Sequence, residues 1–277
     1  MVSRLTYKEL ISRIQDLGIE AGDTVHLQSS LAMVGPIEAG PSDQEMLDFY
    51  YHALWEVIGP NGTLLVHTPF EDYGRFGTPF IVEESPSRAG VFSEYVRTRA
   101  GAIRSIHPIV STAGVGKNAE LICGGNHYSG FGYDSSWGRM HRNNVKFLFL
   151  GVYIRKYLSF IHYIESVFNV PYLYTKIYPT PVYKNNVKIE RQFAMAVRYL
   201  DFSIAWDITN FESILRQNKL INETKLGRSI LQVCNAEEVF NKGMQCLSEN
   251  MYIFLKNPPN FKFGQIPADG FTGPQPS

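Results

Sequence analysis

A histidine and a glutamate lie three residues apart in the apolar stretch LSFIHYIESVFNVPY, residues 158–172. On a helix, His162 and Glu165 would share one face, because residues three or four apart are neighbours on its surface. A neutral imidazole can accept a proton near pH 7, and the helix dipole favours that neutral form in a first turn. The carboxylate could bind the other ring nitrogen and so fix the tautomer and the ring direction. The pair is a candidate general base with the group that orients it.

Two simpler interpretations of the pair stay open. A polar pair inside an apolar helix can satisfy its own hydrogen bonds without any function. A metal site would need further ligands, and the sequence has neither an HExxH motif nor a cluster of Cys and His. Another set with helical spacing, Asp48, His52 and Glu56, lies opposite an apolar helix face, so we interpret it as a solvated surface.

The usual nucleotide and hydrolase motifs are missing. STAGVGK resembles a phosphate-binding loop, but Ser111 replaces the first Gly and Asn118 replaces the required Ser or Thr. No GxGxxG follows a strand, and there is no GxSxG elbow. The sequence therefore argues against nucleoside-triphosphate hydrolysis, the common dinucleotide fold and an α/β-hydrolase nucleophile.

Two polar loops could bind a ligand, although both could also be ordinary loop and core segments. HLQSSLAMVG places Ser29 and Ser30 where a strand ends, before a turn at Gly35. Such a turn can direct backbone N–H groups at an anion or a carbonyl oxygen. The segment RSIHPIVS gathers donors suited to phosphate or amide ligands around a proline: Arg104, Ser105, His107 and Ser111.

The candidate base is positioned by the strand before it. KFLFLGV is a short apolar run of the kind buried on both faces of a sheet. The helix that follows is expected to begin near Ser159, whose hydroxyl could cap the free backbone N–H groups. Two earlier helices are expected to begin with a Thr6 cap and with a capping box formed by Ser42 and Glu45.

Strand and helix patterns alternate through the first 170 residues. DTVHLQSSL and TLLVHTPF are predicted strands, VFSEYVRTRAG is a predicted helix, and residues 71–90 are predicted to be a loop. This order predicts an α/β fold, a layered α/β/α sandwich around a central mixed sheet.

The last hundred residues have a different pattern. TPVYKNNVKIERQFAMAVRYLDF reads as a hairpin around Lys184-Asn185-Asn186, expected as an antiparallel addition to the same sheet. Helices are expected near 209–217 and 236–255. Residues 1–277 are predicted to form a single domain, with 257–277 as a loosely ordered tail.

The composition restricts the partners. Lys plus Arg and Asp plus Glu both number 26, so the formal net charge is zero, which argues against nucleic-acid binding. No apolar run reaches the roughly 18 residues of a membrane span, and no signal peptide is recognised. Three cysteines without CxxC spacing predict a reducing, cytoplasmic setting. The sequence leaves open whether the chain forms a homo-oligomer.

Together, these segments resemble the aminoglycoside 3-N-acetyltransferase family, acyl-CoA-dependent N-acyltransferases outside the GNAT fold. The matching segments follow the family's order over about residues 20–170: GDTVHLQSSLAMVG, GPNGTLLVHTPF, GVFSEYVRTRAGAIRSIHPIVSTAGVG, YDSSWGRM, FLFLGV and SFIHYIE. The last hundred residues carry little of the resemblance. Where the family usually has a Thr-containing polar run before the histidine, this chain has YIRKYLS, with Ser159 in place of the threonine.

The resemblance implies an enzyme in which His162 is the general base for the attacking amine and Glu165 holds it. It also implies acyl-CoA as co-substrate, no metal, and direct attack on the thioester without an acyl-enzyme. Backbone groups near Ser30 to Gly35, with Ser111 nearby, would receive the thioester and pantetheine. Arg104 and His107 would support the loop or contact the cofactor. The implied cofactor-binding residues are Ser29, Ser30, Leu31, Val34 and Gly35, with Arg104, His107 and Ser111.

The charge pattern bears on the acceptor amine. Members of the family acetylate aminoglycosides or acylate nucleotide-linked amino sugars for surface polysaccharides such as lipopolysaccharide. Arg155 and Lys156 would repel a polycationic aminoglycoside and attract a diphosphate, and loop aromatics such as Tyr73 could stack a base or a sugar. We therefore expect a nucleotide-linked amino sugar, most specifically a dTDP-3-amino-3,6-dideoxyhexose, bound by Arg155, Lys156, Ser159 and Tyr73.

Two alternatives remain, and the acyl group is open. An aminoglycoside acceptor is the alternative within the same chemistry, and an inactive binding relative is the alternative from another class. The transferred group could be acetyl or a short hydroxyacyl, and the sequence does not decide between them.

Overall fold

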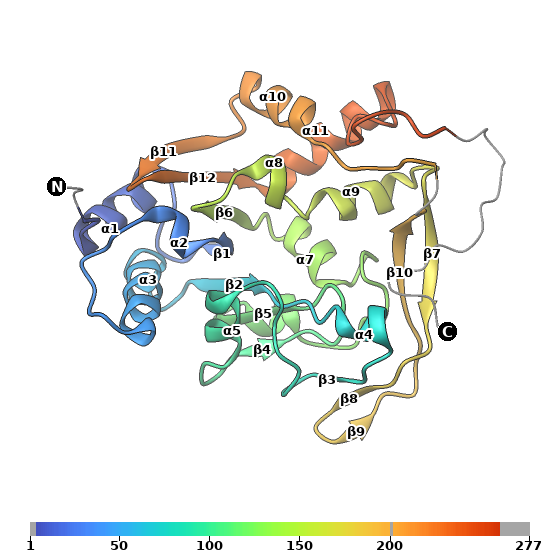
Figure 1. Ribbon diagram of the computed structural model, residues 1–277, viewed down its shortest axis with the longest axis horizontal. Helices are drawn as coiled ribbons and strands as arrows, with labels where there is room; N and C mark the ends of the chain where they lie inside the picture. The colour runs from blue at the N-terminus through green and yellow to red at the C-terminus, as the bar shows by residue number, and fades with distance from the viewer. Residues whose placement is uncertain (1–3, 200–201, 261–277) are drawn as a thin grey trace.

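A mixed sheet of seven strands forms the centre of the computed structural model, which describes residues 4–199 and 202–260. Its strands are β1 (Thr24–Ser29), β2 (Thr63–His67), β4 (Ile103–Arg104), β5 (Thr112–Gly116), β6 (Lys146–Leu150), β11 (Asn222–Leu226) and β12 (Ser229–Asn235). They lie in the order β11-β12-β6-β1-β2-β5-β4 (Figure 1). β6, β1 and β2 are parallel neighbours, and β12 and β5 flank them in antiparallel pairing.

Helices cover both faces of this sheet. One face packs against α1 (Tyr7–Asp16), α3 (Asp43–Ile58) and α5 (Val91–Arg97). The other packs against α6 (Ala119–Cys123), α7 (Ser136–Arg142), α9 (Ile161–Phe168), α10 (Thr209–Gln217) and α11 (Ala236–Glu249). In β6, Phe147 belongs to the second core and Leu148 to the first, because successive strand side chains point to opposite faces. The predicted α/β/α sandwich is confirmed.

Three short helices lie in the loops between these elements. They are α2 (Leu31–Val34), α4 (Asp72–Phe76) and α8 (Ile154–Tyr157). The prediction that residues 71–90 form only a loop is therefore wrong, because this segment contains α4 and the short strand β3 (Phe80–Ile81).

Two smaller sheets lie beside the central one. β7 (Leu173–Tyr178) pairs with β10 (Phe193–Arg198), at the opposite end of the molecule from α1 in Figure 1. β8 (Val182–Lys184) pairs with β3 and with β9 (Val187–Lys188). The predicted hairpin is confirmed, and Asn185 and Asn186 both have the positive φ that a tight two-residue turn needs.

The prediction that this hairpin extends the central sheet is wrong. Val182 is buried in a separate cluster with Phe80 and Tyr73, so the hairpin has a small core of its own. The antiparallel addition to the central sheet is instead β11–β12, which pairs with β6.

Local sequence signals place several helix ends correctly. Thr6 Oγ1 accepts a hydrogen bond from the Glu9 amide at 3.1 Å, and the capping box of α3 is present. The last helix is shorter than expected and ends at Glu249. Residues 257–260 contain no helix or strand, and the rest of the predicted tail, 261–277, lies outside the described residues.

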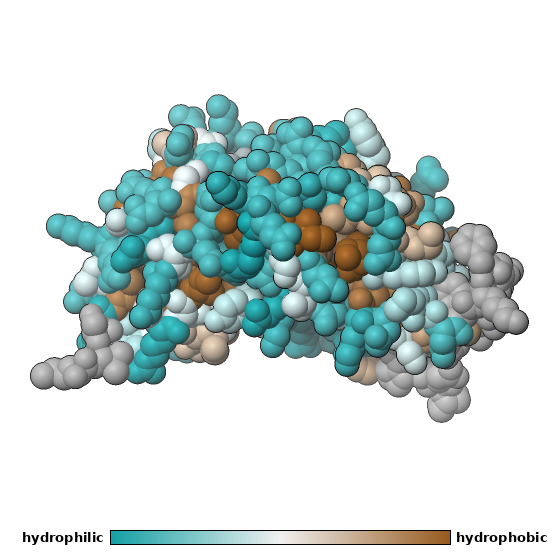
Figure 2. Space-filling view, turned by 90° about the horizontal axis from the view of Figure 1, so that it is seen from above, coloured by the Kyte–Doolittle hydropathy of each residue, from teal (hydrophilic) through white to brown (hydrophobic). Residues whose placement is uncertain are grey.

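The surface and the polar clusters give few signs of other partners within the described residues. No helix there is both long and apolar enough to cross a membrane. Likewise, no group of three or more His, Cys, Asp or Glu side chains in the described ranges could hold a metal ion. In the view of Figure 2, hydrophobic residues form separate patches among hydrophilic ones.

The loops that follow β1 and β6 are locked together at one edge of the sheet. These two strands are parallel, so their carboxyl ends meet there. The Ser30 amide donates to the Leu150 carbonyl at 2.9 Å. Gly151 has φ of +73°, and a Cβ at this position would lie 2.3 Å from the Ser30 carbonyl oxygen. Only glycine fits this close approach, which places the chain leading to α9 directly beside the first loop.

A buried histidine in β1 makes the stability of the fold depend on pH. The ring of His26 packs between Trp137 and Phe147, with both centroid distances 5.5 Å. Neither ring nitrogen has a hydrogen-bond partner among the described residues. Burial, with a smaller contribution from His67, lowers the pKa of His26 to about 3. The folded protein therefore keeps this imidazole neutral.

Replacing His26 with Leu should make stability less sensitive to acid. The pKa of His26 in the folded protein is about 3, below the ordinary value of 6.5. Between these two pH values, the unfolded chain binds a proton that the folded protein does not. The free energy of unfolding then falls as pH falls, by about 1.4 kcal/mol per pH unit for this one group. Urea denaturation at several pH values should show a shallower slope in the variant, and an unchanged slope would contradict a neutral buried His26.

Candidate active site

His162 and Glu165 form a hydrogen-bonded pair at the start of α9. His162 Nδ1 lies 2.9 Å from Glu165 Oε2. A carboxylate can only accept, so Nδ1 carries the hydrogen and Nε2 keeps the lone pair that can take a proton. The Glu165 side chain is fully buried, whereas 29% of the His162 side chain is exposed. A substrate can therefore reach the imidazole without reaching the carboxylate.

Glu165 has two further donors, both on its other oxygen. The Tyr172 hydroxyl donates to Oε1 at 2.7 Å and the Trp206 indole N–H donates to the same atom at 2.8 Å. A buried charge is costly unless it is hydrogen-bonded, and three donors offset that cost here. The Trp206 ring also lies against the His162 ring, with centroids 4.4 Å apart. Trp206 thus contacts both members of the pair.

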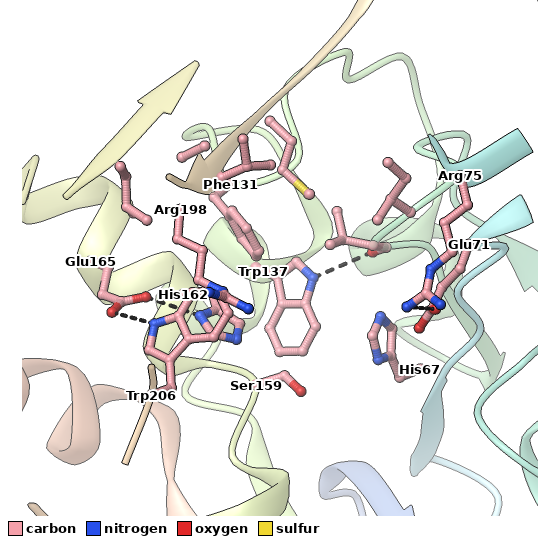
Figure 3. A pocket seen from close by; sticks show the side chains of 16 residues that line it. His67, Glu71, Arg75, Phe131, Trp137, Ser159, His162, Glu165, Arg198 and Trp206 are labelled. Carbon is pink, nitrogen blue, oxygen red and sulfur yellow. Dashed lines mark hydrogen bonds and ion pairs between the residues drawn. The ribbon is translucent and has the colours of Figure 1, made fainter. Parts of the chain in front are cut away.

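A cavity of about 550 Å³ opens onto this pair. Figure 3 shows His162, Glu165 and Trp206 on one side, with His67, Glu71 and Arg75 on the other and the Trp137 ring between them. Phe131 and Met195 add apolar surface to the lining. We call this space the main cavity. Its aromatic and apolar walls with a few polar groups are typical of a site for a small molecule.

A second cavity, of about 340 Å³, reaches the same histidine. Arg155 and Lys156 line it, and it shares Ser159, His162 and Trp206 with the main cavity. We call it the side cavity. The imidazole can therefore be approached from two spaces, as a reaction between two substrates requires.

His67 is a cavity residue that the sequence analysis missed. It is the last residue of β2 and lies across the main cavity from His162 (Figure 3). Burial, then the nearby His162 and Arg104, lower its pKa to about 4, so His67 is neutral at pH 7. Its place at the carboxyl end of a predicted strand in an α/β fold was the signal that could have identified it.

Trp206 and Tyr172 were also missed, for a different reason. Trp206 lies in a segment without regular periodicity, between Phe202 and Ile208. Neither Trp206 nor Tyr172 belongs to a motif of the family resemblance. Their role depends on contacts with Glu165 that no spacing rule predicts.

The predicted cap of α9 is wrong. The N-cap residue is Phe160, and no side chain caps the helix. The chain turns tightly at residues 158–160, so backbone carbonyls accept the first N–H groups, with the His162 amide donating to the Ser159 carbonyl at 3.1 Å. Ser159 instead lines both cavities beside the histidine.

The second polar loop is buried behind the cavity wall. Arg104 is 7% exposed and donates to the backbone carbonyls of Val82, Ser85 and Thr68. Ser111 Oγ donates to the Thr68 carbonyl, and His107 Nε2 lies 3.2 Å from the Ala194 carbonyl. These contacts fit support of the loop rather than direct contact with a cofactor. Burial lowers the pKa of His107 to about 3 and that of Arg104 to about 9.

The remaining predicted residues lie in different places. Ser29 ends β1, Ser30 precedes α2, and Leu31 and Val34 are buried in that short helix. Gly35 follows it with φ of +93°. Tyr73 is 1% exposed and is not among the residues that line either cavity. Its hydroxyl donates to the Thr180 carbonyl at 2.7 Å, which leaves this predicted substrate contact away from His162.

A carboxylate-held histidine lies between two cavities at the edge of a mixed sheet, and this is an arrangement that can serve an enzyme with a general base and two substrates. Comparison with known proteins identifies the family. The family model described as Aminoglycoside 3-N-acetyltransferase matches residues 25–248. The chain belongs to this acyl-CoA-dependent family.

Two curated relatives show the degree of similarity. Aminoglycoside N(3)-acetyltransferase III of Pseudomonas aeruginosa is 25% identical over 230 residues, which cover 76% of this chain and 80% of the relative. Aminoglycoside N(3)-acetyltransferase VII of Streptomyces paromomycinus is 26% identical over 208 residues, covering 68% and 70%. These names favour the aminoglycoside alternative over the nucleotide-linked sugar that the charge pattern predicted.

Solved structures show the same fold. The structure named AAC-IIIb binary with CoASH superposes with a TM-score of 0.75 at 20% identity, covering 93% of this chain and all of the other. The sisomicin-bound AAC-VIa structure gives a TM-score of 0.75 at 20% identity, covering 89% of this chain and 99% of the other.

Replacing Trp206 with Phe should slow any reaction that uses His162 as its base. The variant keeps a ring against the imidazole but removes one of the donors to Glu165, so the carboxylate that holds the imidazole loses one of its hydrogen bonds. The value of kcat should fall by on the order of tenfold.

Two further variants complete this test. Tyr172→Phe removes the other donor to the same oxygen and should also lower kcat. Trp55→Phe makes the same chemical change on α3, outside both cavities, and should leave kcat unchanged. An unchanged kcat in the Trp206 variant would show that the indole N–H does not act on the pair.

Proposed function

We propose that this protein transfers an acetyl group from acetyl-CoA to an amine of an aminoglycoside. The observation that carries the proposal is the His162–Glu165 pair, with Nδ1 occupied and Nε2 free at the junction of two cavities. The family membership supplies the acyl donor class, and the names of the relatives support the acceptor class.

The chemistry follows from the free ring nitrogen. An ammonium is not a nucleophile, so the acceptor attacks as the neutral amine, after one proton has left to solvent. His162 Nε2 accepts a second proton from the amine nitrogen as that nitrogen attacks the thioester carbonyl. A carbon–nitrogen bond forms, the carbon–sulfur bond breaks, and the proton on the imidazole passes to the departing CoA thiolate. Glu165 holds the ring through Nδ1 and stabilises the transient imidazolium.

The main cavity offers a place for a cationic sugar. Glu71 lies across it from the histidine (Figure 3) and pairs with Arg75 at 2.7 Å. Both side chains are about half exposed, and such pairs contribute little stability. A second ammonium of the acceptor can therefore displace Arg75 from the carboxylate. The aromatic rings of Phe131 and Trp137 complete the wall beside it.

The charge argument against aminoglycosides loses its force because of where the two cations lie. Arg155 and Lys156 line the side cavity and do not belong to the lining of the main cavity. Arg155 also lies 4.0 Å from the Glu212 carboxylate, which offsets its charge. A polycation in the main cavity is thus not placed directly against these two residues.

The direct test measures release of CoA thiol from acetyl-CoA with aminoglycosides and, separately, with dTDP-linked amino sugars. We expect release with aminoglycosides and a mass increase of one acetyl group in the product. His162→Asn should lower the rate by on the order of 10² to 10⁴. Release only with nucleotide-linked sugars would overturn the acceptor, and no release with any amine would overturn the enzymatic function.

Replacing Glu71 with Gln should weaken binding of the acceptor and leave binding of the cofactor unchanged. Loss of one half-exposed charge contact costs about 1 kcal/mol, so the KM for the aminoglycoside should rise about fivefold. The KM for acetyl-CoA should stay the same. Glu84→Gln, an exposed carboxylate outside the main cavity, is the matched control. Equal acceptor KM values in the two variants would remove Glu71 from the acceptor site.

A further inference from the structure

The charges that line the main cavity are balanced, and this bears on how many ammonium groups an acceptor can carry. Among the described residues, two carboxylates and two guanidinium groups belong to the lining: Glu71, Glu165, Arg75 and Arg198. A polycation binds best where the local potential is negative. The surroundings of each charged group therefore decide which ammonium groups the cavity can hold.

Neither carboxylate is freely available to an ammonium group. The Glu165 side chain is fully buried, and its oxygens already accept the hydrogen bonds of His162, Tyr172 and Trp206. Glu71 is about half exposed but pairs with Arg75 at 2.7 Å. An incoming ammonium has to displace Arg75 to pair with Glu71, so this carboxylate offers a place for one positive group.

Arg198, the last residue of β10, adds a positive charge to the wall near His162. Figure 3 shows its side chain reaching towards the Trp206 and His162 rings. The guanidinium carbon lies 5.0 Å from the centre of the Trp206 ring, whose centre is 4.4 Å from that of His162. No carboxylate in the described part of the chain forms an ion pair with Arg198, so its charge is not offset.

The contacts of Arg198 fix its guanidinium and leave donors for a ligand. Nη1 donates to the Ile204 carbonyl, and the Trp206 ring attracts the cation through its face. A guanidinium has five N–H donors and no acceptor, so donors remain for the cavity. A hydroxyl oxygen can accept a hydrogen bond from them. An ammonium has only N–H donors and is repelled by the like charge, so Arg198 favours a hydroxyl at this place.

The opposite wall of the cavity adds no negative charge to compensate. His67 lies there with its ring centre 5.5 Å from that of Trp137, and its Nε2 has no hydrogen-bond partner among the described residues. Because its pKa is lowered to about 4, the ring is neutral at pH 7. A neutral imidazole can exchange a hydrogen bond with a hydroxyl but attracts an ammonium less than a carboxylate does.

We propose that Arg198 makes the main cavity selective for acceptors that carry a hydroxyl, and not a further ammonium, close to the reacting amine. This inference rests on the proposed acetyl transfer to an aminoglycoside and narrows the class of acceptor. The preferred acceptor has few amines: one ammonium pairs with Glu71, and hydroxyl groups face Arg198 and His67. The aromatic rings of the lining pack against the apolar side of its sugar rings.

The test uses three acceptors in the acetyl-CoA assay. Kanamycin B is compared with kanamycins A and C, each of which has a hydroxyl in place of one of its amines, at different positions of the same sugar ring. The wild-type protein should use kanamycin A or C with a kcat/KM on the order of tenfold above that for kanamycin B. Arg198→Gln removes the charge and should raise kcat/KM for kanamycin B to within about twofold of the better of the other two. Added salt should reduce the wild-type preference, because it screens the repulsion.

Two control variants separate the charge of Arg198 from its effect on folding. Arg198→Lys keeps the charge and should keep the preference for the hydroxyl-bearing acceptor. Arg191→Gln removes an exposed cation just before β10, outside the main cavity, and should also leave the preference unchanged. A loss of folded protein would lower the rates with all three acceptors alike, so the ratio of kcat/KM values reports recognition.

Two results would overturn the selectivity. One is a wild-type protein that uses kanamycin B as well as, or better than, kanamycins A and C. The other is a wild-type ratio that persists in Arg198→Gln. A protein that acetylates none of the three acceptors would instead overturn the proposed function, and the selectivity with it.

Discussion

One buried carboxylate holds the candidate active site together. Glu165 accepts hydrogen bonds from three side chains that come from three parts of the chain: His162 on its own helix, Tyr172 just beyond it, and Trp206 some forty residues later. A charge without solvent contact must be fully hydrogen-bonded, so the folding of these parts is coupled through one group. The same requirement sets the imidazole tautomer. Stability and chemistry therefore depend on the same three contacts.

The central sheet is the second constraint, because it determines where the loops lie. Three parallel strands end at one edge, so the loop after β1, His67 at the end of β2 and the chain leading to α9 converge without any long-range sequence signal. Gly151 allows two of these segments to touch. The histidine pair and His67 both line the main cavity at this edge.

The sequence predicted what periodicity and local chemistry control. The layered α/β/α order, the caps of α1 and α3, the hairpin at Asn185 and the His162–Glu165 pair all follow from spacing and turn residues. The misses depend on tertiary contacts. The hairpin joined a separate sheet because its apolar residues pack on the 71–90 segment, and the Ser159 cap failed because a tight turn offers carbonyls instead. Arg155 lines the side cavity and not the main cavity, and this placement depends on packing that no local sequence pattern contains.

The two-stranded β7–β10 sheet has a consequence for how such enzymes diverge. Met195 and Arg198 of β10 line the main cavity, yet their ladder is separate from that of the central sheet. Substitutions on this ribbon can reshape this wall of the main cavity while the strands that present His67 and the loops near His162 keep their register. Within one family, the range of amines accepted can therefore drift under selection while the acyl-transfer step stays fixed.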